Sequence, residues 1–157
     1  MEKHIKLQEM RYEKTKGKYS VLSFGERKGR HFFIVSVGGE WPTAYVEAKP
    51  GEDRDSVEDL FNGKTFPHGG LTYGPEGLLH LKDAHPGADI DDSIFALKYW
   101  GWDYGHLCDY CTWKGDPEYS ALMQPEDLGD KHTVDEIYEN DVIPFIDLIE
   151  KKSTGQI

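Results

Sequence analysis

Aromatic and β-branched residues cluster in short runs along the first third of the chain, a pattern typical of β-strands. Residues 19–24, 31–37 and 43–48 form three such runs, and the polar, glycine-bounded stretch 25–30 predicts a hairpin with a longer loop. Because adjacent strands with short links usually pair, we expect an antiparallel meander. Residues 2–14 fit either a strand or a helix, since apolar alternation there accompanies a Lys/Glu-rich composition.

The middle of the chain predicts one short helix, a long loop and one buried strand. Residues 55–61 place apolar side chains on one side of a helix that an Asn-Gly pair ends. Glycine and proline mark residues 62–92 as mostly loop, with a short strand at 71–73. Residues 94–102 are apolar on both faces, which predicts a strand in the centre of the sheet.

The strongest helix pattern lies near the C-terminus. Thr133 and Glu136 fit a capping box, and hydrophobic residues then recur at a spacing of three or four. These residues are Val134, Ile137, Tyr138, Val142, Phe145 and Ile149. Pro144 is expected to kink or split the helix. The predicted class is α+β, a single domain over residues 1–157 with a mostly antiparallel sheet and a long C-terminal helix packed on one face.

Composition narrows the class of protein. The 157 residues are 38% hydrophobic and 13% aromatic, which favours a folded chain over a disordered one. No apolar run reaches the roughly 18 to 20 residues that span a bilayer, so we expect no membrane association. The N-terminus lacks the apolar core of a signal peptide, which predicts a cytoplasmic location.

Charge is distributed unevenly along the chain. The net charge is −11, with a balance of +5 in residues 1–31 and −16 in residues 32–157. Because nucleic-acid binding relies on basic surface, the acidic body argues against general nucleic-acid binding. It fits either an ordinary solvated surface or a mimic of nucleic acid that occupies a basic groove on another protein.

Two short segments carry the candidate chemistry. In the first, His68 precedes Gly69 and Gly70, whose lack of side chains lets a ligand approach, although a tight turn would need the same residues. In the second, Asp103, His106 and Asp109 are spaced by three and would share one face of a helical turn. Together with His68 these three would form a two-histidine, two-carboxylate site for Zn, Mn or Fe(II). Such an ion would make bound water nucleophilic.

The alternatives to this metal site are structural. The two aspartates would then satisfy loop N–H groups, and His106 would pack against aromatic rings. Cys108 and Cys111 form a lone C-x-x-C that fits two incidental thiols, a redox pair, or a zinc site completed by the two histidines. The stretch 80–92, with its histidines and aspartates, is interpreted as a solvated loop that could also serve a site.

The two segments resemble a group of uncharacterised proteins encoded by bacteriophages and prophages. In that group an H-G-G-L-T-Y stretch, here residues 68–73, is followed by a G-[FW]-D-x-x-H-x-x-D segment, here residues 101–109. The resemblance covers about 50 residues, from 66 to 110, and implies a phage setting in the host cytosol rather than a mechanism. It raises His68, Asp103, His106 and Asp109 above the other polar residues.

Three functions remain open, and the sequence does not decide whether the protein is an enzyme. The first is a pocket for a small polar ligand, such as a nucleotide or a host signalling molecule. Its expected lining comprises His68, Gly69, Gly70, Thr72, Tyr73, Trp102, Asp103, His106 and Asp109, with Trp100 and Tyr104 as further stacking rings. The second is a metal-dependent hydrolase at the same His/Asp set. The third is an acidic protein that inhibits a host protein by binding it, without an active site.

Overall fold

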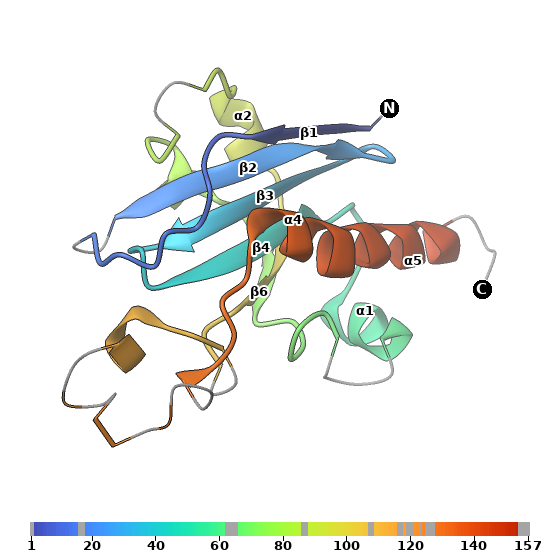
Figure 1. Cartoon of the computed structure of the whole chain (residues 1–157). Helices are drawn as coiled ribbons and strands as arrows, with labels where there is room; N and C mark the ends of the chain where they lie inside the picture. Colours follow the sequence, from blue (N-terminus) through green and yellow to red (C-terminus); the bar gives the residue numbers. More distant parts are fainter. Residues whose placement is uncertain are drawn as a thin grey trace.

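One antiparallel sheet organises the chain in the computed structural model (Figure 1). The structure describes residues 2–15, 18–61, 66–85, 88–106, 109–115, 118, 121–122, 124 and 128–153. Six strands lie within these residues, in the order β1-β2-β3-β4-β6-β5. They are β1 (Lys3–Lys6), β2 (Tyr19–Arg27), β3 (Arg30–Val37), β4 (Trp41–Glu47), β5 (Tyr73–Glu76) and β6 (Tyr99–Asp103). The predicted α+β class is confirmed.

The hairpin between β2 and β3 is tighter than the sequence predicts. Its turn consists of two residues, Lys28 and Gly29, with φ of 50° and 78°. Positive φ at both central residues matches the twist of the flanking strands, so no longer loop is needed and the prediction of one was wrong. The polar residues from Gly25 to Arg27 extend β2, where Gly25 pairs with His4 of β1. The N-terminal segment is therefore partly a strand.

The predicted buried strand at 94–102 was wrong in its first half. Asp91 accepts a hydrogen bond from the backbone N–H of Ser93 and begins the short helix α2 (Asp92–Phe95). Only the second half pairs, as β6 between β4 and β5, where its first four residues are buried. The helix α1 (Arg54–Leu60) forms where the sequence predicts one. Short 3-10 turns follow β5 as η1 (Leu79–Leu81) and β6 as η2 (Thr112–Gly115).

The C-terminal helix is continuous but changes its winding. Thr133 Oγ1 accepts from the Glu136 backbone N–H at 3.1 Å and caps α4 (Val134–Ile137), as the capping box predicts. A π-helical turn, η4 (Tyr138–Val142), follows, and α5 (Ile143–Ser153) completes the helix. Pro144, in the first turn of α5, has no N–H to donate. The π-helical turn lies directly before the proline, and the helix continues through both in Figure 1, so the predicted split does not occur.

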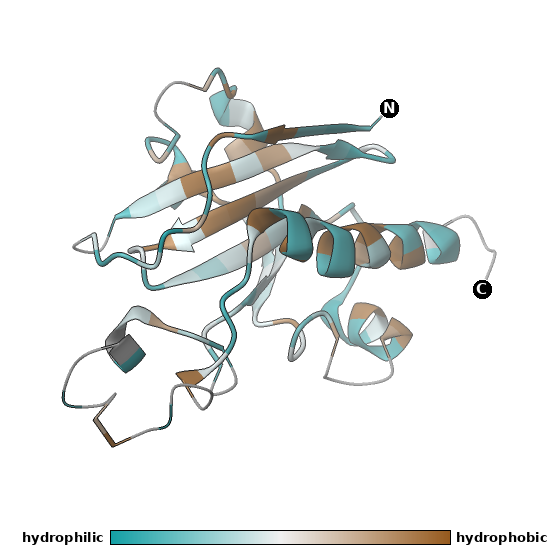
Figure 2. Cartoon of the chain, viewed as in Figure 1, coloured by the Kyte–Doolittle hydropathy of each residue, from teal (hydrophilic) through white to brown (hydrophobic). Residues whose placement is uncertain are grey.

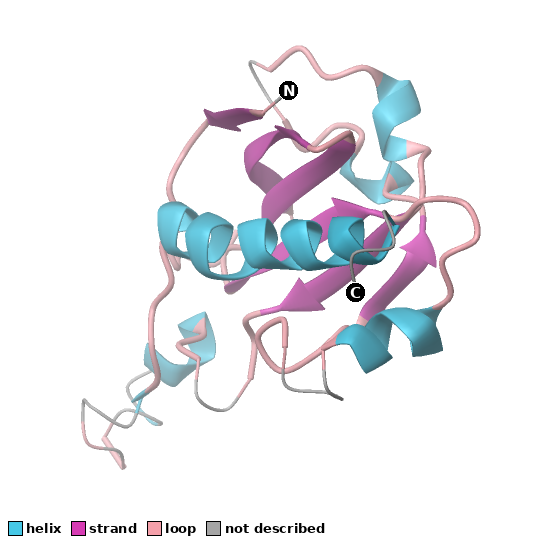
Figure 3. Cartoon of the chain, turned by 90° about the vertical axis from the view of Figure 1, so that its right-hand side faces the viewer, coloured by secondary structure: helices cyan, strands magenta, loops and turns pink. Residues whose placement is uncertain are grey.

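Hydrophobic residues cover both faces of the sheet. One face packs against the C-terminal helix, which crosses the strands in Figure 3 and shows interleaved hydrophobic and hydrophilic residues in Figure 2. Phe145 of α5 is fully buried there, with its ring 4.8 Å from Phe61 and 5.1 Å from Trp102. The other face is covered by η1, α2 and the loop between them. The six apolar residues predicted for the helix are all buried.

A buried arginine ties three elements together at one end of the sheet. Arg30 begins β3 and has no exposed surface. Its guanidinium donates to both carboxylate oxygens of Glu52, at 2.9 and 2.5 Å, and lies 3.4 Å from Glu150 of α5. Glu52 also accepts from Trp100 Nε1 at 3.2 Å. A buried cation is tolerated because these carboxylates neutralise it.

Candidate functional site

The carboxylate of Asp109 is the centre of the candidate site. Asp109 is 1% exposed and lies beyond β6, where its backbone bridges to Asp130. Its Oδ1 lies 2.7 Å from His68 Nε2 and 2.7 Å from His132 Nε2. Its Oδ2 accepts from the backbone N–H of His106 at 3.0 Å and lies 3.2 Å from His106 Nδ1. One buried carboxylate thus gathers three imidazoles from three separate segments.

Electrostatics at this cluster follow from its burial and its charges. Burial alone would raise the pKa of Asp109, but hydrogen bonds from His132 and His68 hold it well below its usual range. Burial lowers the pKa of His68, but the hydrogen bond to Asp109 and the charges of the nearby carboxylates together outweigh burial, so the pKa lies above the ordinary value. Asp109 is therefore an anion at neutral pH, held in a form that can bind cations.

His68 lies in a turn whose backbone has three consecutive positive φ angles. His68, Gly69 and Gly70 all have positive φ, at 26°, 89° and 99°. Glycine adopts such values at little cost, whereas a histidine does so only where its surroundings hold it. A Cβ at Gly69 would lie 2.9 Å from the His106 ring, so this glycine allows the two segments to touch. The His-Gly-Gly sequence thus has a geometric explanation.

The buried ring of Tyr104 packs against two of the three imidazoles. Its ring stacks on His68 with centroids 4.2 Å apart and lies 4.9 Å from the His132 ring. The phenol accepts from Trp102 Nε1 at 3.0 Å and donates to Asp141 of η4 at 2.5 Å. Burial and the nearby Asp141 raise the pKa of Tyr104 far above its ordinary value, so the phenol remains a donor.

Of the four residues predicted to converge, the structure brings three together. Asp103 stands at the margin, with Oδ1 accepting from the Gly105 N–H at 2.9 Å and lying 3.9 Å from His106 Nε2. Its Oδ2 accepts from Thr72 Oγ1 at 3.3 Å. The ligand atoms that lie within 4.8 Å of one another belong to His68, Asp109 and His132. Asp103, which caps the turn at Gly105, and His106 are not in that group, so two of the four predicted metal ligands belong to it.

The aromatic residues predicted to contact a ligand lie elsewhere. Trp102 and Trp100 have no exposed surface, and Tyr104 is 1% exposed, so none presents an open stacking face. Tyr73 packs edge-on against Tyr45 on the sheet face opposite the C-terminal helix. The prediction of a stacking pocket was wrong for Trp100, Trp102 and Tyr104, because all three are buried in the core that the C-terminal helix covers.

His132 is the member of the cluster that sequence reasoning missed. It lies two residues before α4, and the bridge between Asp109 and Asp130 brings its segment alongside. Tyr110 donates its N–H to the Asp130 carbonyl at 2.8 Å in that bridge. The only signal in the sequence is a histidine directly before a helix cap, a junction where scaffolds often carry functional groups.

The cysteine prediction falls partly outside the described residues. Cys108 is not among the described residues, so the prediction for the C-x-x-C pair lies outside the described part of the chain. Cys111 is buried, and burial raises the pKa of its thiol. Both histidines that would complete a zinc site with these cysteines, His68 and His106, contact Asp109 instead. In the loop at 80–92, the His85 ring stacks on Phe95 of the core.

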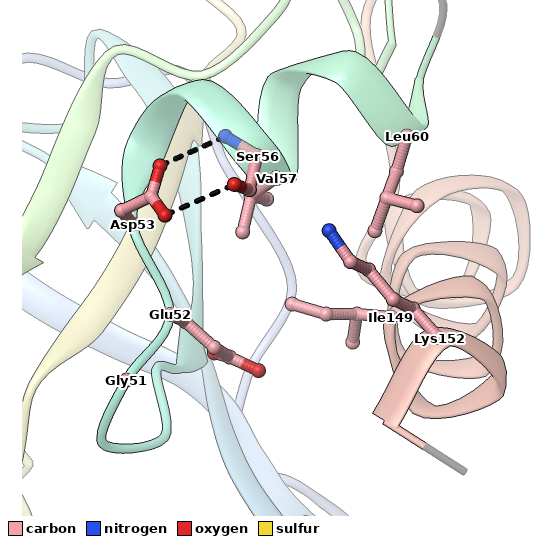
Figure 4. Close-up of a pocket in the computed structure, with 8 residues that line it drawn as sticks. All are labelled: Gly51, Glu52, Asp53, Ser56, Val57, Leu60, Ile149 and Lys152. Atoms are coloured by element: carbon pink, nitrogen blue, oxygen red, sulfur yellow. Dashed lines mark hydrogen bonds between the residues drawn. The ribbon is translucent and has the colours of Figure 1, made fainter. Parts of the chain in front are cut away.

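A separate hollow lies between α1 and α5 (Figure 4). It encloses about 220 Å³ and has Val57, Leu60 and Ile149 among its lining residues. Asp53 closes one side by accepting from the Ser56 N–H and hydroxyl at 3.0 and 2.9 Å. None of the predicted site residues lines this hollow, so it is distinct from the cluster around Asp109.

Comparisons of the chain with protein-family models, curated proteins and solved structures find no match. Within the described part of the chain, no helix has the length and apolar character needed to cross a membrane. The geometry of the cluster is therefore the basis for any functional conclusion.

Proposed function

We propose that the protein is a metal-dependent hydrolase whose divalent ion is held by His68, Asp109 and His132. The observation that carries this proposal is the convergence of their ligand atoms, all within 4.8 Å of one another around a buried carboxylate. Two imidazoles and one carboxylate are a common donor set for Zn²⁺, Mn²⁺ and Fe²⁺. Such a set leaves coordination positions open for water and substrate.

The distances support this assignment. Adjacent ligand atoms around an octahedral ion with bonds of about 2.1 Å lie about 3 Å apart. The Asp109 Oδ1 lies 2.7 Å from each imidazole Nε2, so small movements would admit an ion. The side chains of His68 and His132 are 22% and 16% exposed, which gives solvent access to one side of the cluster.

Residues around the proposed ion are placed to accept a proton and to orient the group that accepts it. A bound divalent ion supplies an acidified water that is nucleophilic near neutral pH. His106 is one-third exposed and adjoins both Asp109 and Asp103, so it is placed to accept a proton at its Nε2. Asp109 Oδ2, 3.2 Å from Nδ1, would orient that imidazole. Asp103 Oδ1, 3.9 Å from Nε2, would stabilise the positive charge that the ring gains, and the Thr72 hydroxyl would hold Asp103 in place.

Metal analysis tests the proposal directly. Purified protein exposed to Zn²⁺, Mn²⁺ or anaerobic Fe²⁺ should retain one equivalent of one of these ions after desalting. His132→Ala should abolish retention, whereas His80→Ala, which alters an exposed histidine outside the cluster, should not. The loaded protein should cleave at least one of a set of chromogenic phosphate and carboxylate esters, and a chelator should stop it. Absence of a bound ion in the unaltered protein would overturn the proposal.

A second candidate is recognition of a small polar ligand without a metal ion. It is favoured by the exposed margin of the cluster, where Thr72, Asp103 and His106 offer hydrogen-bond donors and acceptors. In that case His68 and His132 would only form hydrogen bonds with Asp109. The metal analysis separates the candidates, because a metal-free pocket predicts no difference between His132→Ala and His80→Ala in retained ion.

A further inference from the structure

We propose that Tyr104 and Asp141 are positioning residues of the metal centre, and that they link it to the C-terminal helix. The inference rests on the proposed function, because it concerns how the site of His68, Asp109 and His132 is held. Neither residue contacts Asp109 by a hydrogen bond that the structure describes. Their role follows instead from the chain of contacts that runs behind the two imidazoles.

The first link in this chain is the ring of Tyr104. It stacks on His68 at 4.2 Å with an interplanar angle of 25°, and it also adjoins His132 at 4.9 Å. Because Tyr104 is 1% exposed and tightly packed, its ring restricts how far either imidazole can turn. An imidazole that cannot turn keeps its Nε2 directed at the place where Asp109 Oδ1 lies.

The second link fixes Tyr104 itself. The phenol is held on both sides, by Trp102 Nε1 as donor at 3.0 Å and by Asp141 Oδ2 as acceptor at 2.5 Å. Trp102 lies in β6 and is fully buried, so one anchor belongs to the sheet and the other to the helix. Hydrogen bonds made directly to a metal ligand typically alter metal affinity by about 10- to 100-fold. Because Tyr104 acts on the ligands by packing, we expect effects at the low end of that range.

The third link is the π-helical turn that carries Asp141. The Ile143 N–H bonds to the Tyr138 carbonyl, five residues back, so η4 holds one more residue than an α-helical turn. One extra residue rotates the preceding helix by about 100° relative to the following part. π-Turns within helices are frequent at functional sites. Here the turn presents Asp141 to Tyr104 while Val142 stays fully buried in the core.

Asp141 also contributes charge. Burial raises the pKa of Asp141, while the hydrogen bond from Tyr104 and the charges of His68 and His132 act in the opposite direction; Asp141 bonds to neither histidine in the described contacts. A second anion behind the imidazoles would stabilise a divalent ion in front of them. Asp141 therefore has two separable effects on the centre, one through the position of Tyr104 and one through its negative charge.

Two variants separate these effects. Asp141→Asn removes the charge and keeps an oxygen that can accept from Tyr104. Tyr104→Phe keeps the ring and removes the phenol that both anchors hold. Asp147→Asn is the matched control, because Asp147 lies on the same helix and pairs with Arg27 at 3.0 Å rather than with the site.

Each protein is titrated with Co²⁺ alone, and the visible absorption of the bound ion gives both the affinity and the coordination geometry. We expect the unaltered protein and Asp147→Asn to bind one equivalent with the same affinity. Asp141→Asn should bind about tenfold more weakly with an unchanged spectrum at saturation. Tyr104→Phe should bind at least tenfold more weakly, and its spectrum should shift because the His68 ring is no longer fixed.

Both proteins with altered site residues are checked by circular dichroism without metal. Asp141→Asn retains every packing contact, so it decides the inference even where Tyr104→Phe fails to fold. Affinities of both variants within twofold of the unaltered protein, with identical spectra, would overturn the inference and leave the proposed function standing. Failure of the unaltered protein to bind Co²⁺ or any ion named above would overturn both.

Discussion

Replacing Gly69 by alanine tests whether residue 69 must be glycine because it lies directly against His106 of the candidate site. At Gly69 φ is 89°, and a Cβ there would lie 2.9 Å from Cε1 and Nε2 of His106. Gly51 provides a matched control, because its φ is also 89° and a Cβ would meet nothing within 4 Å. The two substitutions impose the same backbone strain, and only one imposes the contact with the imidazole.

The magnitudes follow from these two differences. An L-residue at positive φ costs about 1–2 kcal/mol, which is the expected loss of unfolding free energy for Gly51→Ala. In Gly69→Ala the His106 side chain, which is 34% exposed, can turn away from the new methyl group. Turning breaks its 3.2 Å contact with the Asp109 carboxylate, a hydrogen bond to a charged group worth about 1.5 kcal/mol net, at the low end because His106 is partly exposed. Gly69→Ala should therefore lose about 2.5–3.5 kcal/mol in total.

Urea unfolding followed by tryptophan fluorescence measures both losses, with equal m-values expected because the exposed surface on unfolding is unchanged. Imidazole NMR resonances, assigned with His106→Ala, should shift for His106 in Gly69→Ala and stay in place in Gly51→Ala. Equal destabilisation of the two variants, together with an unmoved His106 resonance, would refute the reasoning that Gly69 is required by this contact.

Further predictions concern the buried arginine and the core. Glu52→Gln should lower the unfolding free energy by about 3 kcal/mol, as measured by thermal unfolding. This is the low end of the range for a broken buried ion pair, because Glu150 remains beside Arg30. Burial raises the pKa of Glu52, but the hydrogen bonds from Arg30, Lys49 and Trp100 and the charge of Arg30 together lower it below the ordinary value of 4.5. Its stabilisation is complete above that value and is lost as the pH falls through the lower folded pKa, so acid unfolding curves should be steeper for the unaltered protein than for Glu52→Gln. Phe145→Ala should cost about 3–5 kcal/mol in urea, since the side chain is fully buried. Leu79→Ala, at a residue that is 62% exposed, should cost almost nothing.

Local chemistry explains which elements the sequence predicts well. The cap at Thr133 and the helical spacing that follows it depend only on neighbouring residues, so the C-terminal helix could be located. The same holds for α1 and for the strands of the first third, which runs of aromatic and β-branched residues indicate. The prediction of a strand over residues 94–102 was wrong in its first half because a short apolar run does not distinguish a buried helix from a buried strand. The decisive signal there was Asp91, whose side chain caps α2.

The candidate site was predicted in part, for a related reason. His68, His106 and Asp109 stand out because glycines and regular spacing mark their segments. His132 has no such mark, and only the bridge between Asp109 and Asp130 brings it within reach. Asp103 has the expected spacing, yet its carboxylate satisfies the N–H of Gly105 locally. Spacing along the chain does not reveal which of two nearby aspartates will accept a hydrogen bond from its own turn and which will face the site.

The position of His132, directly before the cap of the C-terminal helix, has a consequence for biosynthesis. A ribosome delivers the chain from its N-terminus, so the strands emerge before this histidine and before the helix that carries Asp141. A nascent chain that lacks these last elements holds only part of the donor set. Under the proposed function, the capacity to retain an ion should therefore be acquired late in translation, when the helix docks and the strands are already paired.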